Sequence, residues 1–119
     1  MKRNVILEKS MDFAVRIVKL YQYLSREKGE EVMAQQMLRS GTSVGANVHE
    51  AVEGASKKDF IAKMGISLKE ASETRYWLEL LYRTEYLTEV EYESIRQDCD
   101  EVTRLLVAIV KTSRGSVTP

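Results

Sequence analysis

The sequence contains few of the residues that interrupt helices. Its only proline is Pro119, and glycine occurs six times in 119 residues. Inside a helix, proline costs about 3 kcal/mol and glycine about 1 kcal/mol relative to alanine, so this chain is free to form long helices. The longest apolar run, 105–110, is too short to span a bilayer, and the N-terminus has no signal-peptide apolar region. We therefore predict a cytoplasmic protein without a membrane segment.

Cysteine and histidine each occur once, as Cys99 and His49. A lone cysteine cannot form an internal disulfide, and the spacing of Cys99 between Ile95 and Val102 predicts a buried core position. One histidine cannot supply the two Glu-x-x-His motifs of a di-iron bundle. The nearest preceding arginine, Arg39, is ten residues away, which does not fit the Arg–His spacing of helical-bundle ribonucleases. We predict no catalytic residue, no metal site and no cofactor.

The chain also lacks net charge, with 18 basic and 18 acidic side chains. Nucleic-acid binding relies on lysine and arginine, so a neutral chain is a poor candidate unless its charges segregate in space. Lys57 and Lys58 begin a helix, where cations oppose the helix dipole, which indicates either an anion-facing rim or a solvated loop. The candidate nucleic-acid rim comprises Arg39, Lys57, Lys58, Lys63 and Lys69.

What the sequence does contain is four stretches of helical apolar periodicity. They predict helices over about 5–28, 31–53, 56–84 and 88–113, followed by a disordered tail, 114–119. Asn4 and Ser10 are alternative N-caps for the first helix, while SKKD from Ser56 and TEVE from Thr88 are capping boxes. Because the connections are short, consecutive helices should be antiparallel neighbours. We predict an all-α fold, an antiparallel up-down-up-down four-helix bundle in a single domain, 1–119.

The second predicted helix has an unusually small face. Gly41 and Gly45 are four residues apart within the segment QMLRSGTSVGANVHEAVE, residues 36–53. Two glycines within about one helical turn indicate that another backbone comes very close. This face predicts a contact with a second helix or a second subunit through Ser40, Gly41, Val44, Gly45 and Val48.

The third helix is apolar around more of its circumference than a single core requires. Beyond the core stripe it carries Ile66, Tyr76, Trp77, Leu80 and Leu81, and the first helix similarly adds Met11, Val15 and Val18. These residues form either wide core-facing stripes or a second apolar surface that is buried in an oligomer. We predict that Tyr76, Trp77 and Leu81 contribute to a subunit contact.

Three polar side chains stand out in segments that otherwise pack. Arg39 precedes the glycine-rich stretch, so its side chain can reach across the groove that small residues leave open. Glu70 and Arg75 lie in the largely packed segment KEASETRYWLELL. We predict that each forms an ion pair that fixes the register between helices.

The residues of these helices resemble a known family. RSGTSVGANVHEA, SKKDFIAKMGISLKEASETRYWLELL and FAVRIVKLYQYL are similar to the proteins encoded within intervening sequences of bacterial 23S ribosomal RNA genes. The resemblance extends from about Asn4 to Val110. A related protein, the accessory variability determinant of diversity-generating retroelements, forms a barrel-shaped homopentamer and works with a reverse transcriptase and RNA through a basic surface. One departure is Glu85, where relatives often have a glycine that ends the helix.

The resemblance implies a bundle that forms a ring-like homo-oligomer, with a pentamer favoured, and no established catalytic activity. Two functions stay open at this point. The chain is either a non-enzymatic oligomer that docks RNA or an RNA-binding protein partner, or a purely structural assembly or protein-partner adaptor without nucleic-acid binding. The first predicts that the candidate rim clusters on one surface, and the second predicts that Trp77 is buried between subunits.

Overall fold

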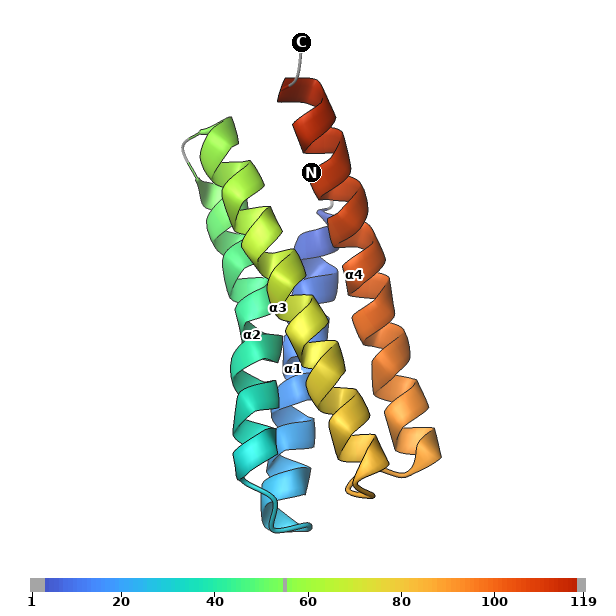
Figure 1. The fold of residues 1–119 in the computed structure, drawn as a ribbon. Helices are drawn as coiled ribbons and strands as arrows, with labels where there is room; N and C mark the ends of the chain where they lie inside the picture. Colours follow the sequence, from blue (N-terminus) through green and yellow to red (C-terminus); the bar gives the residue numbers. More distant parts are fainter. Residues whose placement is uncertain (1–3, 55, 118–119) are drawn as a thin grey trace.

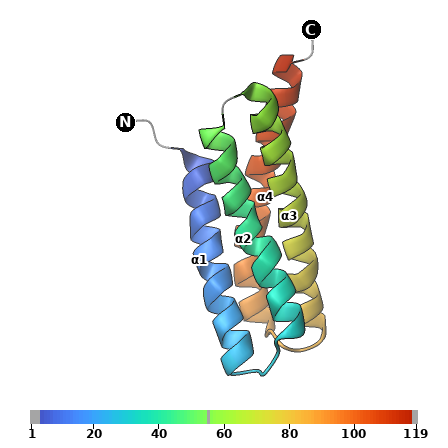
Figure 2. The ribbon, with the colours of Figure 1, turned by 90° about the vertical axis from the view of Figure 1, so that its left-hand side faces the viewer.

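The computed structural model describes residues 4–54 and 56–117, with side chains up to residue 115. These residues form four helices and no strand: α1 (Val5–Arg26), α2 (Val32–Glu53), α3 (Lys57–Arg83) and α4 (Glu89–Val117). Successive helices run in opposite directions side by side (Figure 1 and, turned by 90°, Figure 2). The prediction of an all-α up-down-up-down four-helix bundle is confirmed.

The helices begin where side chains satisfy free backbone N–H groups. Asn4, not Ser10, caps α1, because its Oδ1 accepts a hydrogen bond from the Leu7 N–H at 3.1 Å. The Ser56 hydroxyl accepts from the Asp59 N–H at 3.1 Å at the start of α3. Before α4 the capping box is reciprocal: the Thr88 N–H donates to Glu91 Oε1 at 2.8 Å, and the Glu91 N–H donates to Thr88 Oγ1 at 3.1 Å.

Helix α3 ends in a Schellman motif. The Tyr86 N–H donates to the Leu81 carbonyl at 2.9 Å, and the Glu85 N–H donates to the Tyr82 carbonyl at 3.0 Å. Glu85 has φ 69°, the left-handed conformation that glycine adopts without a steric penalty. The left-handed turn that is expected of a glycine is therefore made here by a glutamate.

Helix α4 differs from its predicted length. The sequence predicted an end near Ser113 and a disordered tail, whereas the structure continues the helix to Val117. Gly115 lowers helix stability by only about 1 kcal/mol, and no proline follows until Pro119, so nothing in this segment breaks the helix. The last two residues of the predicted tail, 118 and 119, lie outside the described residues.

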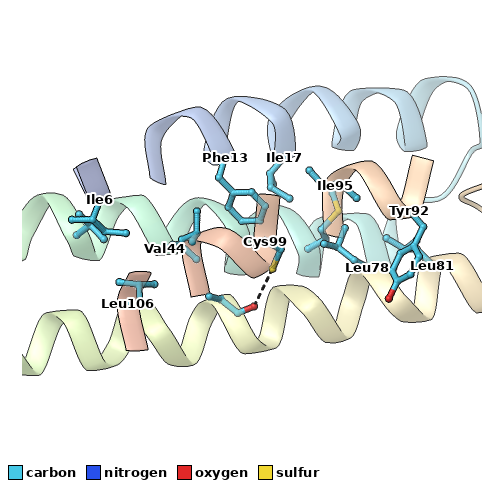
Figure 3. Packing of buried hydrophobic residues seen from close by; sticks show 14 of the residues in the cluster. Ile6, Phe13, Ile17, Val44, Leu78, Leu81, Tyr92, Ile95, Cys99 and Leu106 are labelled. Carbon is cyan, nitrogen blue, oxygen red and sulfur yellow. Dashed lines mark hydrogen bonds between the residues drawn. The ribbon is translucent and has the colours of Figure 1, made fainter. Parts of the chain in front are cut away.

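The core runs the length of the bundle and takes side chains from all four helices (Figure 3). Cys99 is fully buried, as its spacing predicted, and its thiol lies 3.6 Å from the Ala71 carbonyl of α3. Burial raises the pKa of this thiol to about 12. The largest fully buried side chains are Phe13, Ile17, Leu24, Met37, Met64, Leu78, Leu81 and Leu106.

The four interhelix seams are not equivalent. Helix α2 packs closely against both α1 and α3, whereas α1 and α4 make the sparsest contact of the neighbouring pairs. The α1–α4 seam is closed by polar groups: Arg16 Nη1 lies 2.6 Å from Asp98 Oδ2, Arg16 Nη2 donates to the Ser94 hydroxyl at 2.9 Å, and Lys9 pairs with Glu101 at 3.2 Å. These ion pairs are partly exposed, so solvent and salt weaken them.

Candidate interaction surfaces

The two glycines of α2 bring it close to α1. A Cβ added to Gly41 would lie 2.8 Å from Ile17 Cγ2, and one added to Gly45 would lie 3.2 Å from the Ser10 carbonyl oxygen. The first distance is shorter than real Cβ contacts, and Ile17 is fully buried. The close approach predicted from the small residues is therefore a contact between α1 and α2 of one chain.

The neighbouring side of α2 is joined to α3 by buried hydroxyl groups. The Thr74 hydroxyl donates to Ser40 Oγ at 2.8 Å, and the Ser67 hydroxyl donates to the Val44 carbonyl at 2.8 Å. All four residues, with Val48, are fully buried inside the single chain. The small face of α2 is thus occupied by intrachain helix contacts and offers little surface to a second subunit.

Leu81 requires a correction. It was predicted at a subunit contact with Tyr76 and Trp77, but it is fully buried in the core of the single chain. The physical reason is its position on α3, three residues after Leu78 and therefore on the same inward face of the helix. Its burial needs no second subunit.

Tyr76 and Trp77 lie on the outside of α3. The side chain of Tyr76 is 58% exposed and Trp77 is half-buried, with ring centroids 4.9 Å apart at an interplanar angle of 75°. Trp77 Nε1 donates to Glu73 Oε2 at 3.2 Å. Together with the exposed Ile66 we call these residues the α3 patch: Ile66, Tyr76 and Trp77.

Arg39 of α2 forms ion pairs with α3 next to Trp77 of the α3 patch. As predicted, its side chain reaches across from α2, where Nη1 lies 3.1 Å from Glu70 Oε2 and Nη2 pairs with Glu73. The hydrogen bond from Arg39 lowers the pKa of Glu73, and the bond from Trp77 acts in the same direction. The hydrogen bond between Trp77 and Glu73 was not predicted from the sequence, although the i,i+4 spacing of the two residues indicates such a contact.

A second uncovered surface lies on α1. Met11, Val15 and Val18 follow the i, i+4, i+7 spacing of one helix face, and Met11 is 62% exposed. We call these three residues the α1 stripe. In the single chain neither the α1 stripe nor the α3 patch is covered by another helix, so the wide apolar circumference predicted from the sequence extends beyond the core.

The five residues of the candidate rim do not gather into one basic surface. Lys63 pairs with Glu50 at 2.9 Å, and Arg39 is held by its two glutamates. Arg39 lies level with residues 70 and 73 of α3, roughly 20 Å along the helix from Lys57 at 1.5 Å per residue. Lys57 and Lys58 are exposed at the start of α3, and Lys69 is exposed near its middle. Carboxylates are interleaved with the cations along this side.

The described residues hold little that suggests catalysis. The His49 side chain is 61% exposed, with Nε2 3.4 Å from Glu53 Oε1. Within residues 4–54 and 56–117, no group of three or more histidine, cysteine or acidic side chains is arranged to hold a metal ion. In the same ranges, no helix has both the length and the apolar character needed to cross a membrane.

Comparison with known proteins identifies the family. The profile described as "23S rRNA-intervening sequence protein" matches residues 2–108. The chain belongs to this family. No curated protein matches it. A crystal structure of a protein of unknown function from the S23 ribosomal protein family of Bacteroides thetaiotaomicron is similar, with 58% sequence identity and a TM-score of 0.89, covering 93% of this chain and 99% of that one.

The similarity to the Bacteroides protein covers 93% of this chain, and the two chains share one fold. Membership of the intervening sequence protein family thus accounts for the fold, and the Bacteroides relative is itself a protein of unknown function.

Proposed function

We propose that this intervening sequence protein is a non-enzymatic building block that assembles with copies of itself, with a pentamer as the expected form. The observation that carries the proposal is the presence of two apolar surfaces, the α1 stripe and the α3 patch, that the single chain leaves uncovered. In the single chain the indole N–H of Trp77 is hydrogen-bonded to Glu73, which also pairs with Arg39. Tryptophan and arginine are enriched near the centres of protein interfaces.

Replacing Trp77 by alanine tests this function. We expect the wild-type protein to sediment as a multiple of the chain mass and Trp77→Ala to shift toward smaller species at the same concentration, because a central aromatic anchor is lost. The mass is measured by sedimentation velocity over a concentration series. Tyr23→Ala, which removes a half-buried aromatic ring from the α1–α4 groove, is the matched control and should leave the mass unchanged. A wild-type monomer at all concentrations would refute the assembly.

RNA docking is a second candidate function. It is favoured by Lys57 and Lys58, which are exposed at one end of α3 and form no salt bridge among the described residues. The pairing of Arg39 and Lys63 with carboxylates weighs against it. Binding to a structured RNA and to duplex DNA is measured across a salt series. RNA docking would be established by an affinity that falls steeply as salt rises and that the double variant Lys57→Glu with Lys58→Glu abolishes. No binding at low salt would rule out docking and leave self-assembly as the proposed function.

A further inference from the structure

The second half of α4 carries positive charge on its outer side. No acidic residue follows Glu101 in the sequence. Arg104 and Lys111 are exposed, and neither forms a salt bridge within the part of the chain that the structure describes. They are seven residues apart, which is about two helical turns, so they lie on one side of α4 at a separation of about 10 Å along its axis. No contact within the chain neutralises these two charges.

The carboxylates next to Arg104 in the sequence are already paired with other cations. Asp100 Oδ2 lies 2.7 Å from Arg96 Nη1. Glu101 pairs with Lys9 of α1 at 3.2 Å. Arg104 therefore remains available to an anion from outside the chain.

Lys57 extends this positive surface onto α3. It precedes Arg75, which reaches α4, by eighteen residues, or about five full turns, and so lies on the α4 side of α3. The Cys99 thiol lies against the Ala71 carbonyl, and α3 and α4 run in opposite directions (Figure 1). Lys57 is therefore level with the last turns of α4, close to Lys111. It is exposed and forms no salt bridge among the described residues.

The one acidic residue near the start of α3 lies on a different side. Asp59 precedes Glu70 by eleven residues, about three turns, and Glu70 pairs with Arg39 of α2 at 3.1 Å. A Cβ on Gly54 at the end of α2 would also lie 3.8 Å from the Asp59 Cβ. Asp59 thus belongs to the α2 side of α3 and does not neutralise the cations beside α4.

Apolar side chains lie between the two cations of α4. Val107 and Ala108 follow Arg104 by three and four residues, which places them on the same side of the helix. Val107 is 47% exposed, and Ala108 is also exposed. We call the surface formed by Lys57, Arg104, Val107, Ala108 and Lys111 the α4 face.

We propose that the α4 face binds an acidic amphipathic helix of a partner protein. Two carboxylates seven residues apart on that helix would meet Arg104 and Lys111, and an apolar residue midway between them would contact Val107. Charge complementarity selects an acidic partner, and the seven-residue spacing of the cations matches the repeat of a helix packed along α4. This inference goes beyond self-assembly and does not depend on it.

The apolar centre of the α4 face favours a peptide over RNA. Single-stranded RNA is bound by aromatic side chains on which bases stack, in addition to cations. All residues of the α4 face are described by the structure, and none of them is aromatic. An aliphatic side chain of a partner helix can bury Val107 and Ala108, whereas a phosphate group cannot.

A designed peptide tests the proposal. The probe is a fluorescent helical peptide of about three heptads, with two glutamates seven residues apart and a leucine between them. Fluorescence anisotropy should show binding at low salt that the double variant Arg104→Glu with Lys111→Glu weakens at least tenfold, and that Val107→Asn also weakens. Lys19→Glu, the reversal of an exposed cation on α1, is the control and should leave the affinity unchanged. Circular dichroism confirms that each variant is folded.

A charge exchange checks that the contact is direct. A peptide with lysines in place of its two glutamates should bind the double variant and should not bind the wild type. Failure of this exchange would overturn the pairing of the glutamates with Arg104 and Lys111.

Other outcomes would overturn the α4 face as a helix-binding site. They are no binding of the acidic peptide to the wild type, equal binding of an unstructured polyglutamate of the same charge, and tighter binding of a structured RNA that the same double variant abolishes. Sedimentation velocity separates this proposal from self-assembly. A monomeric wild type that binds the peptide would refute the assembly and support the α4 face, whereas a double variant that dissociates a wild-type oligomer would place the α4 face between copies and overturn the proposal.

Discussion

At the scale of single residues, Glu85 shows where this chain departs from the most stable choice. Its φ of 69° lies in the region that costs residues with a Cβ about 1 kcal/mol or more, while the Schellman hydrogen bonds around it are complete. The helix end is therefore specified by the surrounding packing and not by the residue in the turn.

Glu85→Gly should raise the free energy of unfolding by about 1 kcal/mol, because glycine adopts positive φ without the steric penalty. Urea denaturation followed by circular dichroism measures the change. Thr84→Gly, one residue earlier at φ −96°, is the control and should give no gain. Equal stability of Glu85→Gly and the wild type would mean that the turn stores no strain.

At the scale of helices, Gly41 of α2 is required by packing, whereas Gly65 of α3 is not. Gly41 is enclosed by Ile17, whereas a Cβ at Gly65 would have no atom within 4 Å. The sequence pattern identified the first glycine as a packing requirement, because it lies four residues from a second glycine on a face of small residues. Gly65 has no such neighbour and only weakens α3.

Alanine at these two positions should therefore change stability in opposite directions. Gly65→Ala should raise the free energy of unfolding by about 1 kcal/mol through helix propensity. Gly41→Ala should lower it by about 1–3 kcal/mol, because Ile17 is buried and cannot move aside. Chemical denaturation of both variants measures the pair. If Gly41→Ala instead raised the free energy of unfolding, α1 and α2 would be able to move slightly apart without loss of stability.

The start of α4 should respond to acid. Hydrogen bonding from the Thr88 backbone lowers the pKa of Glu91 below its usual value. A carboxyl group with a lowered pKa contributes stability that is present above its unfolded pKa and is lost as the pH falls through the folded pKa. Glu91→Gln should make the acid side of the stability profile less steep, as measured by urea denaturation between neutral pH and pH values below 4.5. Glu89→Gln removes a charge from the same turn without this reciprocal bond and should retain the wild-type slope.

At the scale of the whole molecule, the buried Cys99 reports global opening. Because burial raises the pKa of its thiol to about 12, the native protein should hardly react with a disulfide reagent at pH 8, whereas the unfolded chain should react at once. The reaction is followed by absorbance in the absence and presence of denaturant. Rapid labelling of the native protein, at a rate independent of urea, would show that α3 and α4 separate locally.

Helical periodicity and capping residues were sufficient to predict the four helices, because these signals are local. The same periodicity placed Cys99 in the core. Leu81 was misassigned because apolar residues all round α3 do not indicate which of them face inward. The partners of Arg39 also depend on how α2 and α3 are aligned, which spacing within one helix cannot provide. Which cations of α3 and α4 share one face is likewise a property of the folded bundle.

The unequal seams of the bundle have a consequence for how the chain folds. Most helix contacts join neighbours along the sequence, and the long-range α1–α4 contact is the sparsest. Proteins dominated by local contacts fold in microseconds to milliseconds, since little loop-closure entropy is lost before contacts form. We expect α1, α2 and α3 to associate while α4 is still being synthesised on the ribosome, so that the closing of the α1–α4 seam is the last step.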